Sequence, residues 1–359
     1  MKQAPEKINA RLIKIIQQLL WVIVWFLLFL LFLLYVSFFG LPDFTSTDTS
    51  AGQSATTTVA LSVGAKPKSE FWEAPDESTA PEEVNYGKAL IMRTAEYLGP
   101  AGSVQKITNG MNCQNCHLDA GTKIYGNNYS AVAYTYPKFR ARSGTEESIE
   151  KRVNDCMERS LNGTALSTDS RELKAIVAYI KWLGKDVPKG ESPKGSGLVE
   201  VAFLDRAADP AKGKLVYDAK CMSCHQADGE GVFNADKTAY TYPPLWGNHS
   251  YNQGAGLYRL SRLAGYVKAN MPLGTNHTNP QLSDEEAWDV AAYINTQSRP
   301  GKDLSKDWPD ISKKPIDHPF GPYSDTFSEK QHKYGPFAPI KKVATEAKQK
   351  AELIKKKNI

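Results

Sequence analysis

The stretches "CQNCH", residues 113–117, and "CMSCH", residues 221–225, decide how this chain is interpreted. Each has two cysteines three positions apart, followed at once by a histidine. This spacing lets two thiols bond covalently to a haem while the adjacent imidazole binds its iron. We therefore predict two covalently attached c-type haem groups. The predicted attachment residues are Cys113, Cys116 and His117 for the first haem and Cys221, Cys224 and His225 for the second.

Two other uses of paired cysteines are less consistent with this pattern. A single zinc site would need both pairs to converge, although about a hundred residues separate them. A redox-active CxxC motif does not require the histidine that follows each pair.

The part of the chain around the two motifs is duplicated. Each half has a Gly-Lys pair, then CxxCH, then the pentapeptide AYTYP, then an amphipathic helix. We therefore predict a mainly α-helical chain with two fused cytochrome c domains, over 70–187 and 200–300, joined by a linker over 188–199. The matched segments are Gly87-Lys88 with Gly213-Lys214, 133–137 with 239–243, and 166–184 with 282–297.

The N-terminus has the pattern of a membrane anchor. Residues 19–41 carry no charge, and as a helix they would be roughly 34 Å long, enough for a bilayer core of about 30 Å. Four basic residues precede this run, which places the N-terminus in the cytoplasm. We expect an uncleaved anchor over 1–42, a flexible tether over 43–69, and the rest on the periplasmic side of a bacterial cytoplasmic membrane. A cleaved signal peptide is the alternative.

The charge of the chain is concentrated at its C-terminus. Residues 341–359 hold seven lysines and two acidic residues, which equals the whole formal excess of +5. The remainder is balanced, which argues against a nucleic-acid partner. We expect a solvated lysine-rich tail there, preceded by an irregular extension over 301–340 that straps the domains.

The second haem has one methionine downstream of its CxxCH motif that can serve as a second axial ligand. Met271 lies shortly before the last helix of the second domain, and methionine is a common partner of histidine on haem iron. We predict ligation by His225 and Met271. His249 and His277 are the rival ligands, each in a polar loop.

The first domain has Cys156 or Met157 at the equivalent position. The stretch 145–161 is predicted to form one helix, on which Arg152, Cys156 and Ser160 share a stripe. A neighbouring cation favours the thiolate, which is the form that binds iron. We favour His117 and Cys156 as the ligands of the first haem, with Met157 as the alternative.

Basic residues are dense just before this helix. Arg140 and Arg142 follow the first AYTYP pentapeptide on a predicted loop, where they can converge on the haem. Arginine forks bind small oxyanions well. A small sulfur-containing anion is therefore a reasonable substrate class.

The combined pattern resembles the dihaem thiosulfate dehydrogenases that form tetrathionate. The resemblance covers about residues 80–340 and includes "HPFGPYSDTFSEKQHKYGPFAPI", residues 318–340. It implies an active site at the Cys156-ligated haem, with Arg142, Arg152 and Ser160 near the sulfur. Some family members have lysine before the second-haem methionine, whereas this chain has Asn270, which we include among the candidate site residues.

The resemblance implies a reaction that joins two thiosulfates and releases two electrons. These would pass from the first haem to the second and then to a soluble c-type cytochrome or similar partner. The reverse reduction of tetrathionate is a further expectation. The alternative is a membrane-anchored dihaem electron carrier without its own substrate. A cytochrome that loads thiosulfate onto a carrier protein is a third interpretation.

Overall fold

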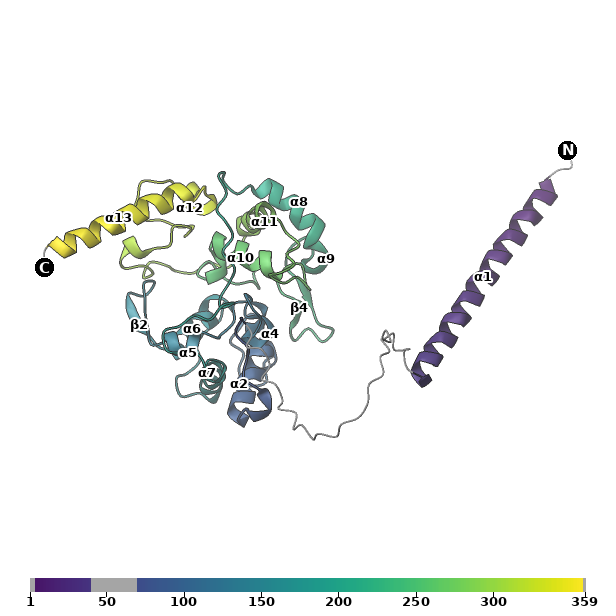
Figure 1. Cartoon of the computed structure of the whole chain (residues 1–359), viewed down its shortest axis with the longest axis horizontal. Helices are drawn as coiled ribbons and strands as arrows, with labels where there is room; N and C mark the ends of the chain where they lie inside the picture. Colours follow the sequence, from purple (N-terminus) through teal and green to yellow (C-terminus); the bar gives the residue numbers. More distant parts are fainter. Residues whose placement is uncertain (1–3, 40–69, 358–359) are drawn as a thin grey trace, which may run out of the picture. The chain divides into compact units, whose positions relative to one another are not determined.

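The computed structural model describes residues 4–39 and 70–357, and Figure 1 shows it as a cartoon. The chain divides after Ala65 into two compact units, and each is described by itself. The larger unit contains both CxxCH motifs.

The smaller unit contains one long helix, α1, Ala4–Phe39. Its described side chains from Ile16 to Leu34 are exposed. Among the residues that the structure describes, no helix meets the length and hydropathy needed to cross a membrane. The predicted anchor therefore stays a prediction, and the predicted tether over 43–69 lies outside the described residues.

The first domain is organised by two crossing helices, α2, Glu82–Met92, and α7, Arg171–Leu183. Gly87 lies at the crossing, where an added Cβ would be 2.0 Å from the carbonyl oxygen of Ala175. The missing side chain lets the two backbones approach closely. Leu90, Leu173 and other apolar residues of these helices form the first hydrophobic core.

The second domain repeats this crossing with α8, Pro210–Lys220, and α11, Asp284–Thr296. An added Cβ on Gly213 would be 1.9 Å from the carbonyl oxygen of Asp289. Tyr179 and Tyr293, from the repeated Ala-Tyr-Ile tripeptide, lie against the two glycines. The duplication predicted from the sequence is therefore present in the structure.

Short elements before and between these helices make up the rest of the two domains. The first domain has η1 Glu77–Thr79, α3 Thr94–Leu98, η2 Cys113–Asn115, α4 Leu118–Gly121, α5 Val132–Thr135, β1 Lys138–Arg140, β2 Thr145–Glu147 and α6 Ile149–Arg159. The second has α9 Met222–His225, β3 Val232–Phe233, β4 Tyr240–Tyr242, η3 Gly256–Tyr258 and α10 Leu260–Asn270.

The predicted helix over 145–161 is shorter than expected. Residues 145–147 form strand β2, which pairs antiparallel with β1 in the register Lys138↔Glu147. Ser148 caps the helix by accepting a hydrogen bond from the backbone N–H of Lys151. The prediction missed this boundary because the strand and the helix are both short and charged.

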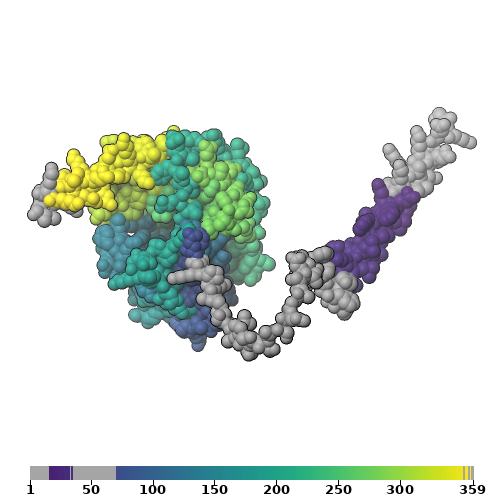
Figure 2. All heavy atoms as spheres, viewed as in Figure 1, coloured from purple at the N-terminus to yellow at the C-terminus, as the bar shows by residue number. Residues whose placement is uncertain are grey.

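The C-terminal extension reaches both domains and ends in a helix. It contains η4 Ile311–Lys313, α12 Glu329–Tyr334 and α13 Ala338–Lys357. Phe337 and Ile340 are buried in the second core. Figure 2 shows α13, in yellow, extending outward from the body of the molecule, and its described side chains beyond Ile340 are exposed. The extension is thus not irregular throughout, and the described lysine-rich tail up to Lys357 is helical.

Candidate active site

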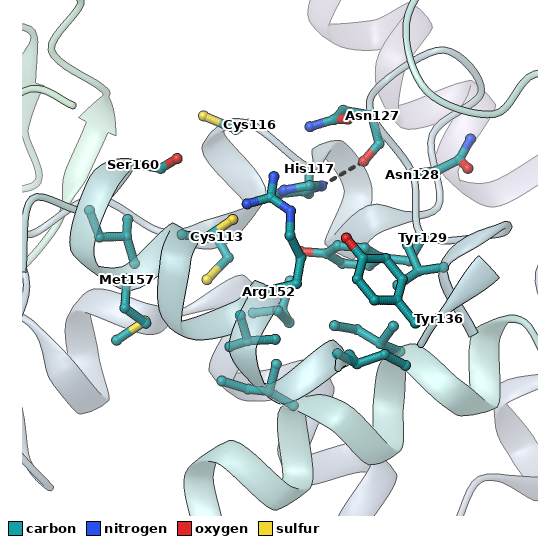
Figure 3. Close-up of a pocket in the computed structure, with 18 of the residues that line it drawn as sticks. Cys113, Cys116, His117, Asn127, Asn128, Tyr129, Tyr136, Arg152, Met157 and Ser160 are labelled. Carbon is teal, nitrogen blue, oxygen red and sulfur yellow. Dashed lines mark hydrogen bonds between the residues drawn. The ribbon is translucent and has the colours of Figure 1, made fainter. Parts of the chain in front are cut away.

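The first CxxCH motif opens onto a cavity of about 250 Å³ (Figure 3). The motif contributes Cys113, Cys116 and His117 to the lining of this cavity. Helix α6 contributes Cys156 and Met157. Much of the remaining wall is apolar. It includes Ile91, Val132, Ile149, Ile176 and Ile180. Two thiols, an imidazole and the sulfur side chains of α6 thus line one largely apolar space, a donor set that fits a c-type haem.

His117 is oriented for a metal bond through its other ring nitrogen. Its Nδ1 lies 2.6 Å from the carbonyl oxygen of Asn127, and its ring stacks on Tyr129 at 4.5 Å between centroids. Burial lowers the pKa of His117 to about 4. A neutral ring whose Nδ1–H is bonded to a carbonyl presents Nε2 for metal binding.

The second CxxCH motif opens onto a cavity of about 210 Å³ that repeats this arrangement. Cys221, Cys224 and His225 line it together with Met271. His225 Nδ1 lies 2.8 Å from the carbonyl oxygen of Pro243.

The rival ligands of the second haem are not among the residues that line this cavity. His249 is exposed, and His277 packs between the rings of Phe71 and Tyr125. The structure brings Met271 together with His225, and the donor set of this cavity also fits a c-type haem.

A third cavity, of about 310 Å³, adjoins the first and is called here the arginine pocket. Cys116, His117, Arg152, Cys156 and Ser160 line both spaces. Six arginines from three segments of the chain line the arginine pocket: Arg140, Arg142, Arg152, Arg159, Arg259 and Arg262. Such a concentration of guanidinium groups is suited to anions.

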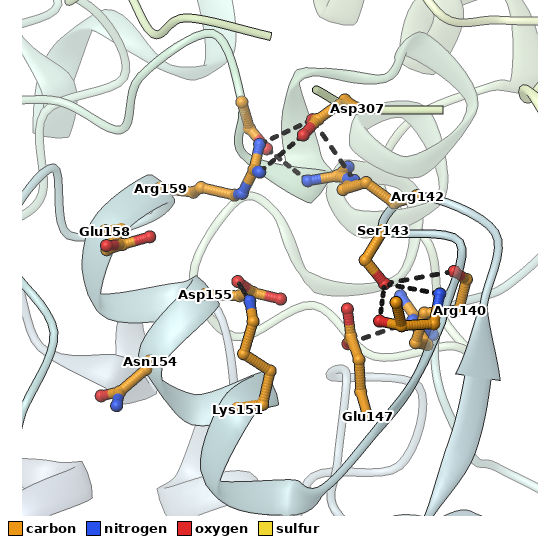
Figure 4. Close-up of polar contacts among 12 residues, drawn as sticks. Arg140, Arg142, Ser143, Glu147, Lys151, Asn154, Asp155, Glu158, Arg159 and Asp307 are labelled. Atoms are coloured by element: carbon orange, nitrogen blue, oxygen red, sulfur yellow. Dashed lines mark hydrogen bonds and ion pairs between the residues drawn. The ribbon is translucent and has the colours of Figure 1, made fainter. Parts of the chain in front are cut away.

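Two of these arginines are held by carboxylates of the C-terminal extension. Arg159 donates two hydrogen bonds of 2.8 Å to Asp307 (Figure 4). Arg259 donates bonds of 2.8 and 2.5 Å to Asp317. Both carboxylates are largely buried, so these pairs fix the walls of the pocket.

Arg142 is held more loosely than Arg159 and Arg259. Its Nη1 donates to the carbonyl oxygen of Gly254 at 2.7 Å, and its Nε lies 3.9 Å from Asp307. Burial, together with the charge of Arg159, lowers the pKa of Arg142 to about 10. An anion bound nearby would stabilise its charged form.

Arg152 lies between the haem cavity and the arginine pocket. Figure 3 shows its guanidinium directed toward His117. In the described part of the chain, no ion pair joins Arg152 to a carboxylate within 4.0 Å. Attraction to a negative charge on Cys156 is the main cause that raises the pKa of Arg152.

The structure brings together four of the five candidate catalytic residues. Arg142, Arg152, Cys156 and Ser160 all line the arginine pocket. Asn270 does not line it: its side chain is buried and donates to the backbone oxygens of Tyr125 and Tyr266. Its placement beside Met271 in the sequence does not bring it to this site.

Met157 lines the first-haem cavity but is almost fully buried, at 1% exposed, and belongs to the hydrophobic core. Cys156 is half-buried and lines both cavities. The sequence interpretation did not single out Arg159, Arg259, Arg262 or Trp308, which also line the arginine pocket. The latter three come from the second domain and the extension, and no local pattern connects them to α6.

Comparison with known proteins assigns the two domains. Residues 210–298 match the cytochrome c family model, and residues 103–188 match the model described as SoxA/TsdA, cytochrome c domain. With the two CxxCH cavities, these matches define a dihaem cytochrome c oxidoreductase that carries two covalently bound haem c groups.

Similarity to whole proteins identifies the family within this class of oxidoreductases. The chain is 39% identical over 243 residues to the thiosulfate dehydrogenase of Psychrobacter arcticus, covering 66% of this chain and 71% of the relative. It is 41% identical over 216 residues to the thiosulfate dehydrogenase of Allochromatium vinosum, and the match covers 58% of this chain and 78% of that relative. The chain therefore belongs to the thiosulfate dehydrogenase family.

A solved structure supports the same assignment. The thiosulfate dehydrogenase of Marichromatium purpuratum aligns with a TM-score of 0.59 at 31% identity, covering 64% of this chain. This chain spans half the length of that protein.

Proposed function

We propose that this oxidoreductase joins two thiosulfate ions into tetrathionate and that it also supports the reverse reduction. The observation that carries this proposal is the position of Cys156. Its side chain lines both the first-haem cavity and the arginine pocket, so one sulfur borders the iron site and the anion site. The names of the relatives support thiosulfate as the substrate.

The arginine pocket supplies the binding energy for a doubly charged anion. Arg152 lacks an ion pair with a described carboxylate, and Arg142 is held chiefly through a backbone oxygen. Both can direct N–H groups at the sulfonate oxygens of thiosulfate. Ser160, one helical turn from Cys156, offers a hydroxyl to the same ion. These contacts place the outer sulfur of thiosulfate toward Cys156.

Cys156 is the proposed sulfur nucleophile, and together with His117 it would hold the iron of the first haem. A bond between the Cys156 thiolate and the outer sulfur of one thiosulfate releases two electrons. The outer sulfur of a second thiosulfate then attacks the outer sulfur of the first, which forms tetrathionate and returns the Cys156 thiolate. The two haem groups, when bound, supply the one-electron acceptors for this oxidation.

We further propose that the electrons leave at the second domain to a soluble c-type cytochrome. His225 and Met271 would hold the iron of the second haem there, which is supported by their position in the lining of one cavity. The uncharged run over 19–41 supports a proposed anchor that holds both domains on the periplasmic side of the membrane.

Anaerobic reduction by thiosulfate alone tests the enzyme against the electron-carrier alternative. The oxidised, haem-loaded chain should develop the absorption of reduced haem on addition of thiosulfate, with tetrathionate as the product. An Arg152→Gln variant should need much more thiosulfate, whereas an Arg93→Gln variant, altered at an exposed arginine outside the pocket, should behave as the parent. A chain that ascorbate reduces but thiosulfate does not would be an electron carrier.

A further inference from the structure

We propose that the arginine pocket contains a second anion subsite, built on Arg262 of the second domain. This subsite binds the far sulfonate of a ligand whose near sulfonate is held by Arg152. The inference rests on the proposed function, because tetrathionate carries a sulfonate at each end. It adds a residue of the other cytochrome domain to the site.

The pocket arginines differ in whether a carboxylate of the protein already binds their guanidinium group. Asp307 accepts both hydrogen bonds of Arg159, and Asp317 accepts both hydrogen bonds of Arg259. Within the described residues, neither Arg152 nor Arg262 forms an ion pair with a carboxylate. Two guanidinium groups are therefore open to an added anion.

The two open arginines come from different domains. Arg152 lies on α6 and is half-buried, whereas Arg262 lies on α10 and is exposed. Both line the arginine pocket. Arg152 also lines the haem cavity, whereas Arg262 does not and is exposed, so we place Arg152 at the haem side of the pocket and Arg262 at its solvent side. A ligand charged at both ends can contact both residues, whereas a singly charged ligand needs only one.

The acidic side chains that line the pocket do not cancel this charge. Glu147 lies 3.9 Å from Arg140, and Asp155 pairs with Lys151. Desolvation and the charge of Arg259 lower the pKa of Arg262, with a contribution from Arg140, while Asp317 and Glu200 oppose the shift. A sulfonate at this position would offset that repulsion between guanidinium groups.

The carboxylates of a bound haem have related oxyanion chemistry and could also pair with Arg262. The two cases differ in what the arginine does for a soluble ligand. A haem carboxylate would make Arg262 affect the haem itself. A second subsite would make Arg262 affect only ligands with two charged ends, through the added strength of two-point binding.

The test compares propane-1,3-disulfonate with methanesulfonate as inhibitors of thiosulfate-dependent haem reduction by the haem-loaded full chain. Neither ion contains a sulfur–sulfur bond, so neither can be turned over. The parent should bind the disulfonate much more tightly than the monosulfonate. In Arg262→Gln the ratio of disulfonate affinity to monosulfonate affinity should fall about tenfold or more. The affinity of this variant for methanesulfonate should not change.

Three further variants complete the design. Arg262→Lys keeps the charge and should retain part of the preference, Arg93→Gln should retain all of it, and Arg152→Gln should weaken both inhibitors. An unchanged preference in Arg262→Gln would overturn the proposal. If Arg262→Gln shifted the haem midpoint potential and lost affinity for both inhibitors equally, the proposal would be overturned, and Arg262 would be assigned to a haem carboxylate.

Direct binding of the two inhibitors, measured by calorimetry, separates this proposal from the proposed function. If thiosulfate yields no tetrathionate while Arg262→Gln still loses the disulfonate preference, the reaction assignment fails and the subsite stands. If tetrathionate forms and the preference is unchanged, the subsite fails and the reaction assignment stands.

Discussion

The hydroxyl of Tyr266 donates a hydrogen bond of 2.6 Å to the backbone oxygen of Asn115, which joins the second domain to the first CxxCH motif. Tyr266 is buried on α10 and lines the second-haem cavity. Cys116, the next residue after Asn115, lines both haem cavities. The attachment site of one haem is therefore part of the wall around the other.

This contact predicts that Tyr266→Phe slows electron transfer between the haems. Loss of the bond should cost about 1 kcal/mol of unfolding free energy and loosen the position of Cys116. The measurement is the rate at which electrons equilibrate between the two haems after rapid photochemical reduction of the protein.

Tyr134→Phe is a matched control, because its hydroxyl also donates a 2.6 Å bond to a backbone oxygen, that of Lys185 within the first domain. Equal electron-transfer rates in both variants would show that Tyr266 does not position the motif.

Replacement of the proposed first-haem ligand predicts a spectroscopic change. Cys156→Gly should abolish the thiolate signature of one haem in electron paramagnetic resonance and absorption spectra, and it should remove thiosulfate oxidation. Met157→Leu should keep the signature, because Met157 is a core residue at 1% exposed and leucine conserves its volume. The reverse pattern would assign the ligand to Met157.

The glycine at the helix crossing predicts a large stability loss on substitution. Gly87→Ala would place a Cβ 2.0 Å from the Ala175 oxygen, so α2 and α7 must separate. We expect a loss of about 3 kcal/mol in unfolding free energy and lower haem incorporation. Gly301→Ala, where an added Cβ meets nothing within 4 Å, is the control and should unfold as the parent does.

A buried histidine of the extension predicts a pH dependence of stability. Burial lowers the pKa of His318 from 6.5 to about 4. Between these values the unfolded chain binds a proton that the folded chain does not, so stability falls as the pH falls from about 6.5 to about 4. The shift corresponds to at most about 3 kcal/mol.

Denaturant unfolding at several pH values measures this effect. His318→Gln should show a smaller loss of stability between pH 6.5 and pH 4 than the parent. His249→Gln, altered at an exposed histidine, should follow the parent. A parallel pH dependence in His318→Gln and the parent would contradict the assignment.

The repeated pentapeptide shows where sequence reasoning reached its limit. AYTYP marks the duplication correctly, yet Val132–Thr135 is helical in the first copy and Tyr240–Tyr242 is a strand in the second. Pairing with β3 gives the second copy its conformation, and that pairing depends on residues outside the pentapeptide. Identical local sequence cannot encode both outcomes by itself.

The candidate site was predictable to the extent that its residues lie near each other in the sequence. The CxxCH motifs and the stripe of Arg152, Cys156 and Ser160 depend on local spacing. Arg262 and Trp308 enter the pocket from α10 and the extension through tertiary packing. Surface arginines are usually solvated, so nothing in the sequence distinguished these positions.

The yield of tetrathionate from thiosulfate is the direct test of the proposed reaction. The purified, haem-loaded chain is mixed with thiosulfate and ferricyanide, and both tetrathionate and reduced ferricyanide are quantified. We expect one tetrathionate for every two electrons transferred, and no tetrathionate from Cys156→Gly. Oxidation of thiosulfate to any other product, or no tetrathionate in either direction of reaction, would contradict it.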